Sequence, residues 1–108
     1  MQSLQFLRLT DKQIERFNAL RSTEDMHTHG PLTVEQEVPL HGHQDVALYV
    51  VNGSAEFTDG EISARLGQGA RLNAVIVPSG HLHGWKALIG LTVIEHTFNG
   101  SVEQVLAA

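Results

Sequence analysis

The 108-residue sequence contains no cysteine. Disulfide crosslinks and thiolate chemistry are therefore excluded, and cysteine usage leaves the redox compartment undetermined. The sequence also lacks any apolar run approaching the ~20 residues of a membrane-spanning helix, and its N-terminus has no basic-then-apolar signal. We therefore expect a cytoplasmic protein without a membrane partner.

Positive charge is scarce as well. The sequence has 7 lysine and arginine residues against 12 aspartate and glutamate residues, which gives a formal net charge of -5 at pH 7. Proteins that bind nucleic acid through its phosphates need a clustered basic face, so no nucleic acid partner is expected. At this length we expect one domain over residues 1–108, which buries roughly 65% of the unfolded surface.

What the sequence does have is a series of short apolar stretches separated by turn residues. The turns recur roughly every eight to twelve residues, which is typical of an all-β sandwich or barrel. The pairs Asn52-Gly53 and Asp59-Gly60 predict hairpins, because these dipeptides favour the turns that join adjacent antiparallel strands. Strands are expected at residues 4–7, 32–39, 46–51, 54–58, 61–66, 70–77, 85–89 and 91–98.

One helix is expected near the N-terminus. Thr10 and Gln13 fit a capping box, and apolar residues then recur at three-residue spacing over residues 11–20. This short amphipathic helix should pack on the outside of the β structure or at a dimer contact. Residues 101–108 are expected to form a short helix or strand. Residues 22–31 are polar and turn-rich, which indicates a loop.

Two histidine pairs are the main candidates for metal-binding residues. His41 and His43 precede the apolar run of residues 46–51. Side chains two residues apart on a β-strand point to the same face, so both imidazoles can reach one point in space. His81 and His83 form a second pair with the same spacing, after an apolar strand that ends in a turn.

Together the two stretches resemble the paired motifs of the cupin family. The first motif has an H-x-H pair, an acidic ligand and a glycine after a hydrophobic run, and it is filled here by His41, His43 and Gly53. The second has the form P-x-G-x-x-H, and it is filled by Pro78, Gly80 and His83. The resemblance covers residues 32–98. It implies a cupin-type jelly-roll β-barrel, here with a short N-terminal helix, and a metal site among its strands.

The acidic ligand of the first motif is missing. Its position falls at or next to Val46, which cannot bind a metal. Asp45 is one residue away, and a one-residue slip turns a strand side chain to the opposite face, so Asp45 would ligate only across a bulge. Glu37 shares the parity of the histidines and is a second candidate, although a surface carboxylate is the favoured interpretation.

We favour a three-histidine site of His41, His43 and His83. Neutral imidazoles suit a divalent transition metal, namely iron, zinc, nickel, manganese or copper, whereas magnesium and calcium prefer oxygen ligands. Apolar and aromatic side chains are expected to shape a pocket beside it, together with a histidine of the last strand: Leu48, Val50, Val75, Val77, Trp85 and His96.

Tyr49 and three further histidines do not occupy the ligand positions of the two motifs. Tyr49 alternates with Leu48 and Val50 and is expected to point outward. His27 and His29 have the spacing of a ligand pair but lie in the expected loop, and His81 is expected to be exposed in a turn.

Two functions of different kinds fit these features. The first is a small metal-dependent enzyme similar to the three-histidine oxygenases of the cupin family, or a lyase or isomerase that uses the metal as a Lewis acid. The second is a non-enzymatic module that binds a small molecule or metal, which the missing acidic ligand favours. In either case the partner is a small molecule. Because such barrels often hide their strand edges by pairing, a homodimer is expected.

Overall fold

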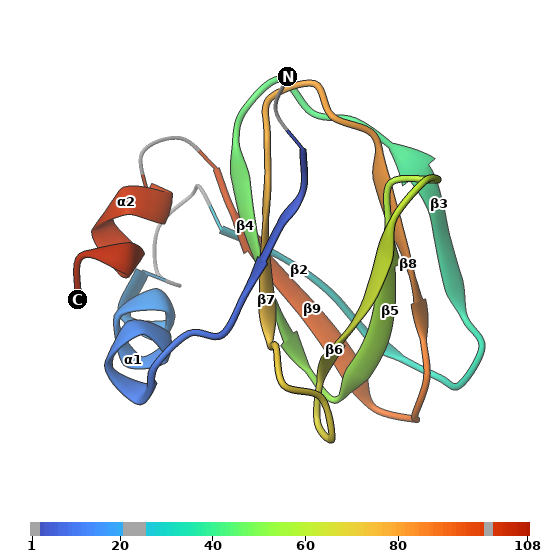
Figure 1. Ribbon diagram of the computed structural model, residues 1–108. Helices are drawn as coiled ribbons and strands as arrows, with labels where there is room; N and C mark the ends of the chain where they lie inside the picture. Colours follow the sequence, from blue (N-terminus) through green and yellow to red (C-terminus); the bar gives the residue numbers. More distant parts are fainter. Residues whose placement is uncertain (1–2, 21–25, 99–100) are drawn as a thin grey trace.

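Two antiparallel sheets make up most of the computed structural model, which describes residues 3–20, 26–98 and 101–108 (Figure 1). The five-stranded sheet has the order β1-β7-β4-β9-β2, and the four-stranded sheet has the order β3-β8-β5-β6. The strands are β1 (Gln5–Leu7), β2 (Met26–Leu32), β3 (Glu37–His41), β4 (Ala47–Asn52), β5 (Ser54–Thr58), β6 (Ser63–Gly67), β7 (Ala74–Val77), β8 (His83–Ala87) and β9 (Thr92–Thr97). The predominance of β structure agrees with the expectation from the turn spacing.

The main hydrophobic core lies between the two sheets. In β4 the alternation of a strand places Ala47, Tyr49 and Val51 in this core, and all three are buried. The facing sheet contributes Phe57 and Trp85 among others. Many antiparallel sheets have one polar face in contact with solvent. Strand β4 has none over residues 47–51, because both of its faces are buried.

Two helices cover that second face of the five-stranded sheet (Figure 1). They are α1 (Asp11–Ala19) and α2 (Ser101–Leu106). Thr10 caps α1 through the capping box with Gln13 that the sequence indicates. A second apolar cluster fills the space between the helices and the sheet, and it consists of Leu9, Phe17, Leu48, Val50, Ala74, Val102 and Val105.

The turn at Asn52-Gly53 corrects one expectation. Strand β4 pairs with β7 and β9, whereas β5 pairs with β6 and β8, so the chain changes sheets at this turn instead of forming a hairpin. Gly53 has a φ of +111°, and a Cβ added there would lie 2.6 Å from Thr92 Oγ1. The position therefore requires glycine both for its backbone conformation and for its close approach to β9. Asp59-Gly60 does join the hairpin of β5 and β6.

The segment before the first histidine pair also differs from the expectation. Residues 26–31, expected to be loop, belong to strand β2, which pairs with β9. The expected strand at residues 32–39 is interrupted, because a turn closed by the bond from Gln36 N to Thr33 O separates β2 from β3. The first residues of the expected loop, 22–25, lie outside the described residues.

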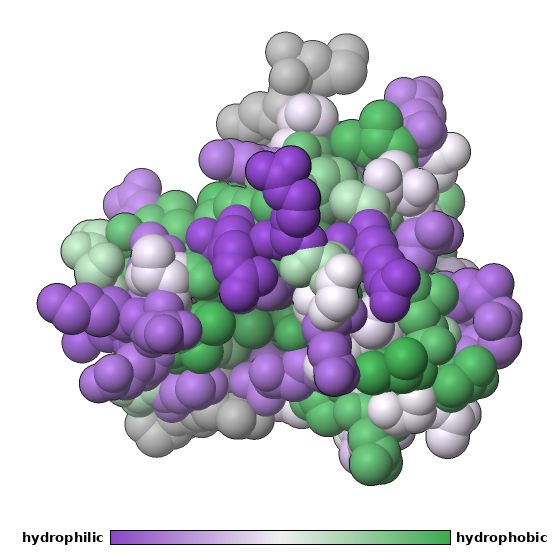
Figure 2. Space-filling view, turned by 60° about the horizontal axis from the view of Figure 1, so that its bottom comes forward, coloured by the Kyte–Doolittle hydropathy of each residue, from purple (hydrophilic) through white to green (hydrophobic). Residues whose placement is uncertain are grey.

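In the described part of the chain, neither helix has the length and apolar character needed to cross a membrane. Figure 2 turns the lower end of Figure 1 forward, where the turn between β4 and β5 lies. Hydrophilic and hydrophobic residues intermix over this face. The motif histidines lie toward the other end, where the connections from β3 to β4 and from β7 to β8 meet (Figure 1).

Candidate metal centre

The centre is built on the pairing of β3 with β8. His41 ends β3 and is the register partner of His83, which begins β8. Directly opposed residues on antiparallel strands place their side chains close together. The ring centroids of the two histidines lie 4.3 Å apart. Their motifs, distant in sequence, are therefore joined by backbone pairing.

His43 reaches the same point from the loop that follows β3. Its carbonyl accepts a hydrogen bond of 2.7 Å from Gly80 N, so the glycine of the second motif holds the loop of the first. The His43 ring centroid lies 5.0 Å from that of His41 and 5.1 Å from that of His83. One ring nitrogen from each of the three residues lies within 4.8 Å of the others, so a single ion could contact all three.

Hydrogen bonds orient two of these rings. Nδ1 of His41 donates to the Pro39 carbonyl at 2.8 Å, and Nδ1 of His83 donates to the His81 carbonyl at 2.9 Å. Each bond places the ring proton on Nδ1 and the lone pair on Nε2, which is how backbone carbonyls commonly orient metal-binding histidines. Nε2 of His43 is buried and has no hydrogen-bond partner among the described residues. Three nitrogen donors in this arrangement fit a divalent transition metal.

The environment favours the uncharged form of the His83 and His43 imidazoles. Burial, together with the neighbouring His41 and His43, lowers the pKa of His83 to about 4, despite the hydrogen bond to the His81 carbonyl. Burial is also the first cause that lowers the pKa of His43. Imidazole binds a metal in its neutral form, so His83 is in a ligating state at neutral pH.

Tyr49 lies inside the site, where the sequence did not place it. Its side chain is fully buried, and Tyr49 Oη lies 2.7 Å from His83 Nε2. Burial raises the pKa of this phenol, so it carries its proton at neutral pH. The expected outward orientation is wrong, because Leu48 and Val50 face the helices and Tyr49 between them faces the main core.

A second group of histidines adjoins the centre. His27 and His29 on β2 stack against His96 on β9, with ring centroids 5.2 Å and 5.1 Å from it. Together with Thr28, His43 and Phe98 they line a recess of about 340 Å³. Burial, together with the surrounding histidines, lowers the pKa of His96 to about 3. Because His43 is among the lining residues, the recess is in contact with one of the three candidate ligands.

The only sequence signal for this second group is the spacing of its histidines. His27 and His29 are two residues apart, like the motif pairs, and His96 shares a strand face with Ile94, which is in the core. Their meeting depends on the register of β2 with β9, which pairs His27 with His96. No motif in the sequence specifies that register.

The acidic candidates lie outside the cluster. Among the residues that the structure describes, the group of metal-binding side chains consists of the three histidines alone. Asp45 and Glu37 are exposed, and Glu37 is on β3 opposite Lys86. His81 is directed elsewhere, with Nε2 3.0 Å from Asp59 Oδ2. The arrangement thus corresponds to the favoured alternative without a carboxylate.

The expected pocket is corrected in part. Leu48 and Val50 lie on the opposite face of β4, in the cluster beneath the helices, because Tyr49 takes the inward position. Val75 and Val77 face inward but are packed in the main core. Trp85 lies beside the centre, with its ring centroid 5.6 Å from that of His41, and His96 lines the recess.

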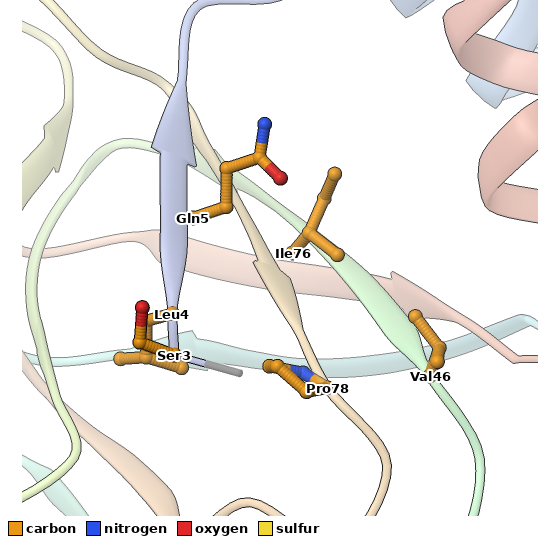
Figure 3. Close-up of a pocket in the computed structure, with 6 residues that line it drawn as sticks. All are labelled: Ser3, Leu4, Gln5, Val46, Ile76 and Pro78. Carbon is orange, nitrogen blue, oxygen red and sulfur yellow. The ribbon is translucent and has the colours of Figure 1, made fainter. Parts of the chain in front are cut away.

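A different depression lies on the outer face of the five-stranded sheet. Figure 3 shows it between β1, β7 and β4, where Ser3, Gln5, Val46 and Ile76 line it. Its volume is about 440 Å³. None of its lining residues is a histidine, so it offers no continuation of the candidate centre.

Structural comparison identifies the fold. No protein-family model and no curated protein sequence matches the chain. A cupin superfamily protein of Desulfitobacterium hafniense superposes with a TM-score of 0.55 at 12% identity, over 89% of this chain and 77% of that one. A cupin-2 domain containing protein of Shewanella frigidimarina gives 0.53 at 19% identity, over 72% and 74%. KdgF from Halomonas gives 0.50 at 19%, over 72% and 83%. With its two histidine motifs brought together between antiparallel sheets, the chain has the fold of the small cupin proteins.

Proposed function

We propose that the protein is a metal-dependent enzyme in which His41, His43 and His83 hold one divalent transition metal that acts on a small molecule. Iron, zinc, nickel, manganese and copper all suit this donor set. The observation that carries the proposal is the convergence of three ring nitrogens to within 4.8 Å of one another. Two of them are oriented by backbone carbonyls in the manner of ligands.

The chemistry follows from what the chain supplies. Three protein ligands leave further coordination positions for a substrate. The metal would provide Lewis-acid or redox chemistry of the dioxygenase, lyase or isomerase kind. The histidines hold it, and His96 Nδ1 is buried without a hydrogen-bond partner among the described residues, so it is available to a molecule in the recess. Trp85 and Phe98 provide apolar surface beside the imidazoles.

The test of this proposal begins with metal content. Untagged protein should carry close to one equivalent of a transition metal by inductively coupled plasma mass spectrometry. Loss of a group that only orients a metal ligand lowers metal affinity roughly 10–100-fold. His41→Ala and His83→Ala each remove a ligand, so each should lower the affinity by more than that. His81→Asn is the matched control, since its ring points to Asp59, and it should retain the metal. Unchanged metal content in the two alanine variants would refute the site.

A second candidate is a binding module without catalysis. The observation that favours it is the exposure of Asp45 and Glu37, which leaves the cluster without a carboxylate ligand. A thermal-shift screen of small carboxylic acids and diketones separates the two functions. A true ligand at a hundredfold excess over its Kd should stabilise the protein by about 2.7 kcal/mol. Stabilising compounds that the metal-loaded protein never converts would favour the module. A cytoplasmic location belongs to either proposal.

A further inference from the structure

The single tyrosine of the chain occupies the lone pair that a metal would need. His83 Nδ1 carries a proton, because it donates to the His81 carbonyl at 2.9 Å. His83 Nε2 is therefore an acceptor, and the contact of 2.7 Å with Tyr49 Oη is a hydrogen bond that the phenol donates. The sequence contains no second tyrosine.

A metal and the phenol cannot share this nitrogen. A transition metal binds a histidine nitrogen at about 2.0–2.2 Å along the lone pair. The tyrosine oxygen lies 2.7 Å from the same nitrogen, which is hydrogen-bond distance. Since one lone pair serves one partner, coordination through His83 Nε2 requires the hydroxyl to release it.

The packing around Tyr49 limits where the hydroxyl can go. The ring is fully buried and contacts the rings of Phe57, Trp85 and His96, with centroids 5.1 Å, 5.4 Å and 4.7 Å away. A ring enclosed in this way cannot swing out to solvent without disrupting the core. The released hydroxyl therefore stays beside the centre, where a buried donor needs a new acceptor.

We propose that Tyr49 is a ligand-positioning residue, whose hydroxyl leaves His83 when the metal binds and then donates a hydrogen bond to the molecule at the open coordination position. This inference rests on the proposed metal site. It also restricts the class of ligand, because the molecule must present a hydrogen-bond acceptor beside the metal. Small oxyanions and carbonyl compounds do so, whereas ligands that offer only donors do not.

Because Tyr49 is the single tyrosine, isotope labelling reports on it alone. Protein carrying ¹³Cζ-tyrosine should give one resonance by nuclear magnetic resonance. Titration with Zn²⁺, which is diamagnetic, should replace this resonance with a second one, and the change should be complete at one equivalent. A resonance that stays in place while zinc binds would overturn the inference.

Substitution of the hydroxyl provides a second measurement. In Tyr49→Phe the competing hydrogen bond is lost, so zinc should bind roughly 2- to 10-fold more tightly, as the net worth of one hydrogen bond implies. Azide, an anion that accepts hydrogen bonds, should bind the cobalt-loaded variant several-fold more weakly than the cobalt-loaded wild type. Visible absorption of cobalt gives both azide affinities.

Phe57→Leu is the matched control, since Phe57 contacts the Tyr49 and His83 rings but has no polar group. It should leave zinc and azide affinities within about twofold of wild type. Equal affinities in Tyr49→Phe and wild type would overturn the role of Tyr49 and leave the metal site standing. Failure of the wild type to bind zinc, cobalt or any other transition metal would instead refute the proposed function together with this inference.

Discussion

His41 and His83 are register partners on neighbouring antiparallel strands, and their ring centroids lie 4.3 Å apart. This pairing explains why two motifs distant in sequence produce one site. The β3–β8 ladder fixes two imidazoles, and the bond from Gly80 N to the His43 carbonyl adds the third. The structure also predicts how three kinds of substitution change stability, and which oligomeric state the protein has in solution.

Replacing His96 should flatten the dependence of stability on pH. Burial lowers the pKa of His96 from 6.5 to about 3 in the folded protein, so the unfolded state takes up a proton first as pH falls. The stability from neutral His96 is full above pH 6.5 and is lost as pH falls toward 3. In His96→Gln, the loss of unfolding free energy between pH 7 and about pH 4.5 should be smaller by about 2–3 kcal/mol.

Urea denaturation at several pH values, with a chelator present, measures this difference. Other groups titrate in the same range, including His83 with its pKa near 4. Most of their contribution cancels when the variant is subtracted from the wild type, because His83 has the smallest of the effects that lower the pKa of His96. Parallel curves for the two proteins would show that His96 does not take part.

Leu48→Ala should destabilise the fold without changing metal binding at the candidate centre. Leu48 is fully buried in the cluster between the five-stranded sheet and the helices. Truncating a buried leucine costs about 2–5 kcal/mol through lost transfer energy and the cavity left behind. Denaturant unfolding measures the loss, and metal analysis of the folded variant should match the wild type. Val34→Ala is the control, because Val34 is 53% exposed and should change stability by less than about 0.5 kcal/mol.

Gly53→Ala should be more harmful than Gly80→Ala. Both glycines have positive φ, +111° and +74°, and both belong to the histidine motifs. A Cβ at Gly53 would also lie 2.6 Å from Thr92 Oγ1, whereas nothing lies within 4 Å of one at Gly80. Backbone strain alone costs roughly 1–2 kcal/mol, so Gly80→Ala should lose about that amount and Gly53→Ala more. Equal losses in thermal unfolding would contradict the close approach of the turn to β9.

A homodimer is expected in solution. Strands β1, β2, β3 and β6 lie at the edges of the two sheets. Natural proteins protect such edges, often by pairing with a second copy. Size-exclusion chromatography with light scattering should give twice the chain mass of 11.8 kDa at micromolar concentration. A monomer under these conditions would contradict the expectation.

Local patterns in the sequence were sufficient for several features. The capping box at Thr10 and Gln13 marks the start of α1, because its hydrogen bonds connect residues three apart. Asp59-Gly60 marks the hairpin of β5 and β6 for the same reason. His41, His43 and His83 stand out as a candidate ligand set through their spacing and the turns beside them. Each of these signals depends on neighbours within a few residues.

The sequence by itself thus determined the abundance of short strands, the first helix and the three histidines. Only the tertiary structure decided which face of β4 turns inward, and with it the place of Tyr49 beside His83 and of Leu48 beneath the helices. It also decided that the chain changes sheets at Gly53 and that His27 meets His96. The physical reason is that strand register and the choice of partner strand arise from packing between distant segments. A shift of one residue in register moves every side chain of a strand to the opposite face of the sheet.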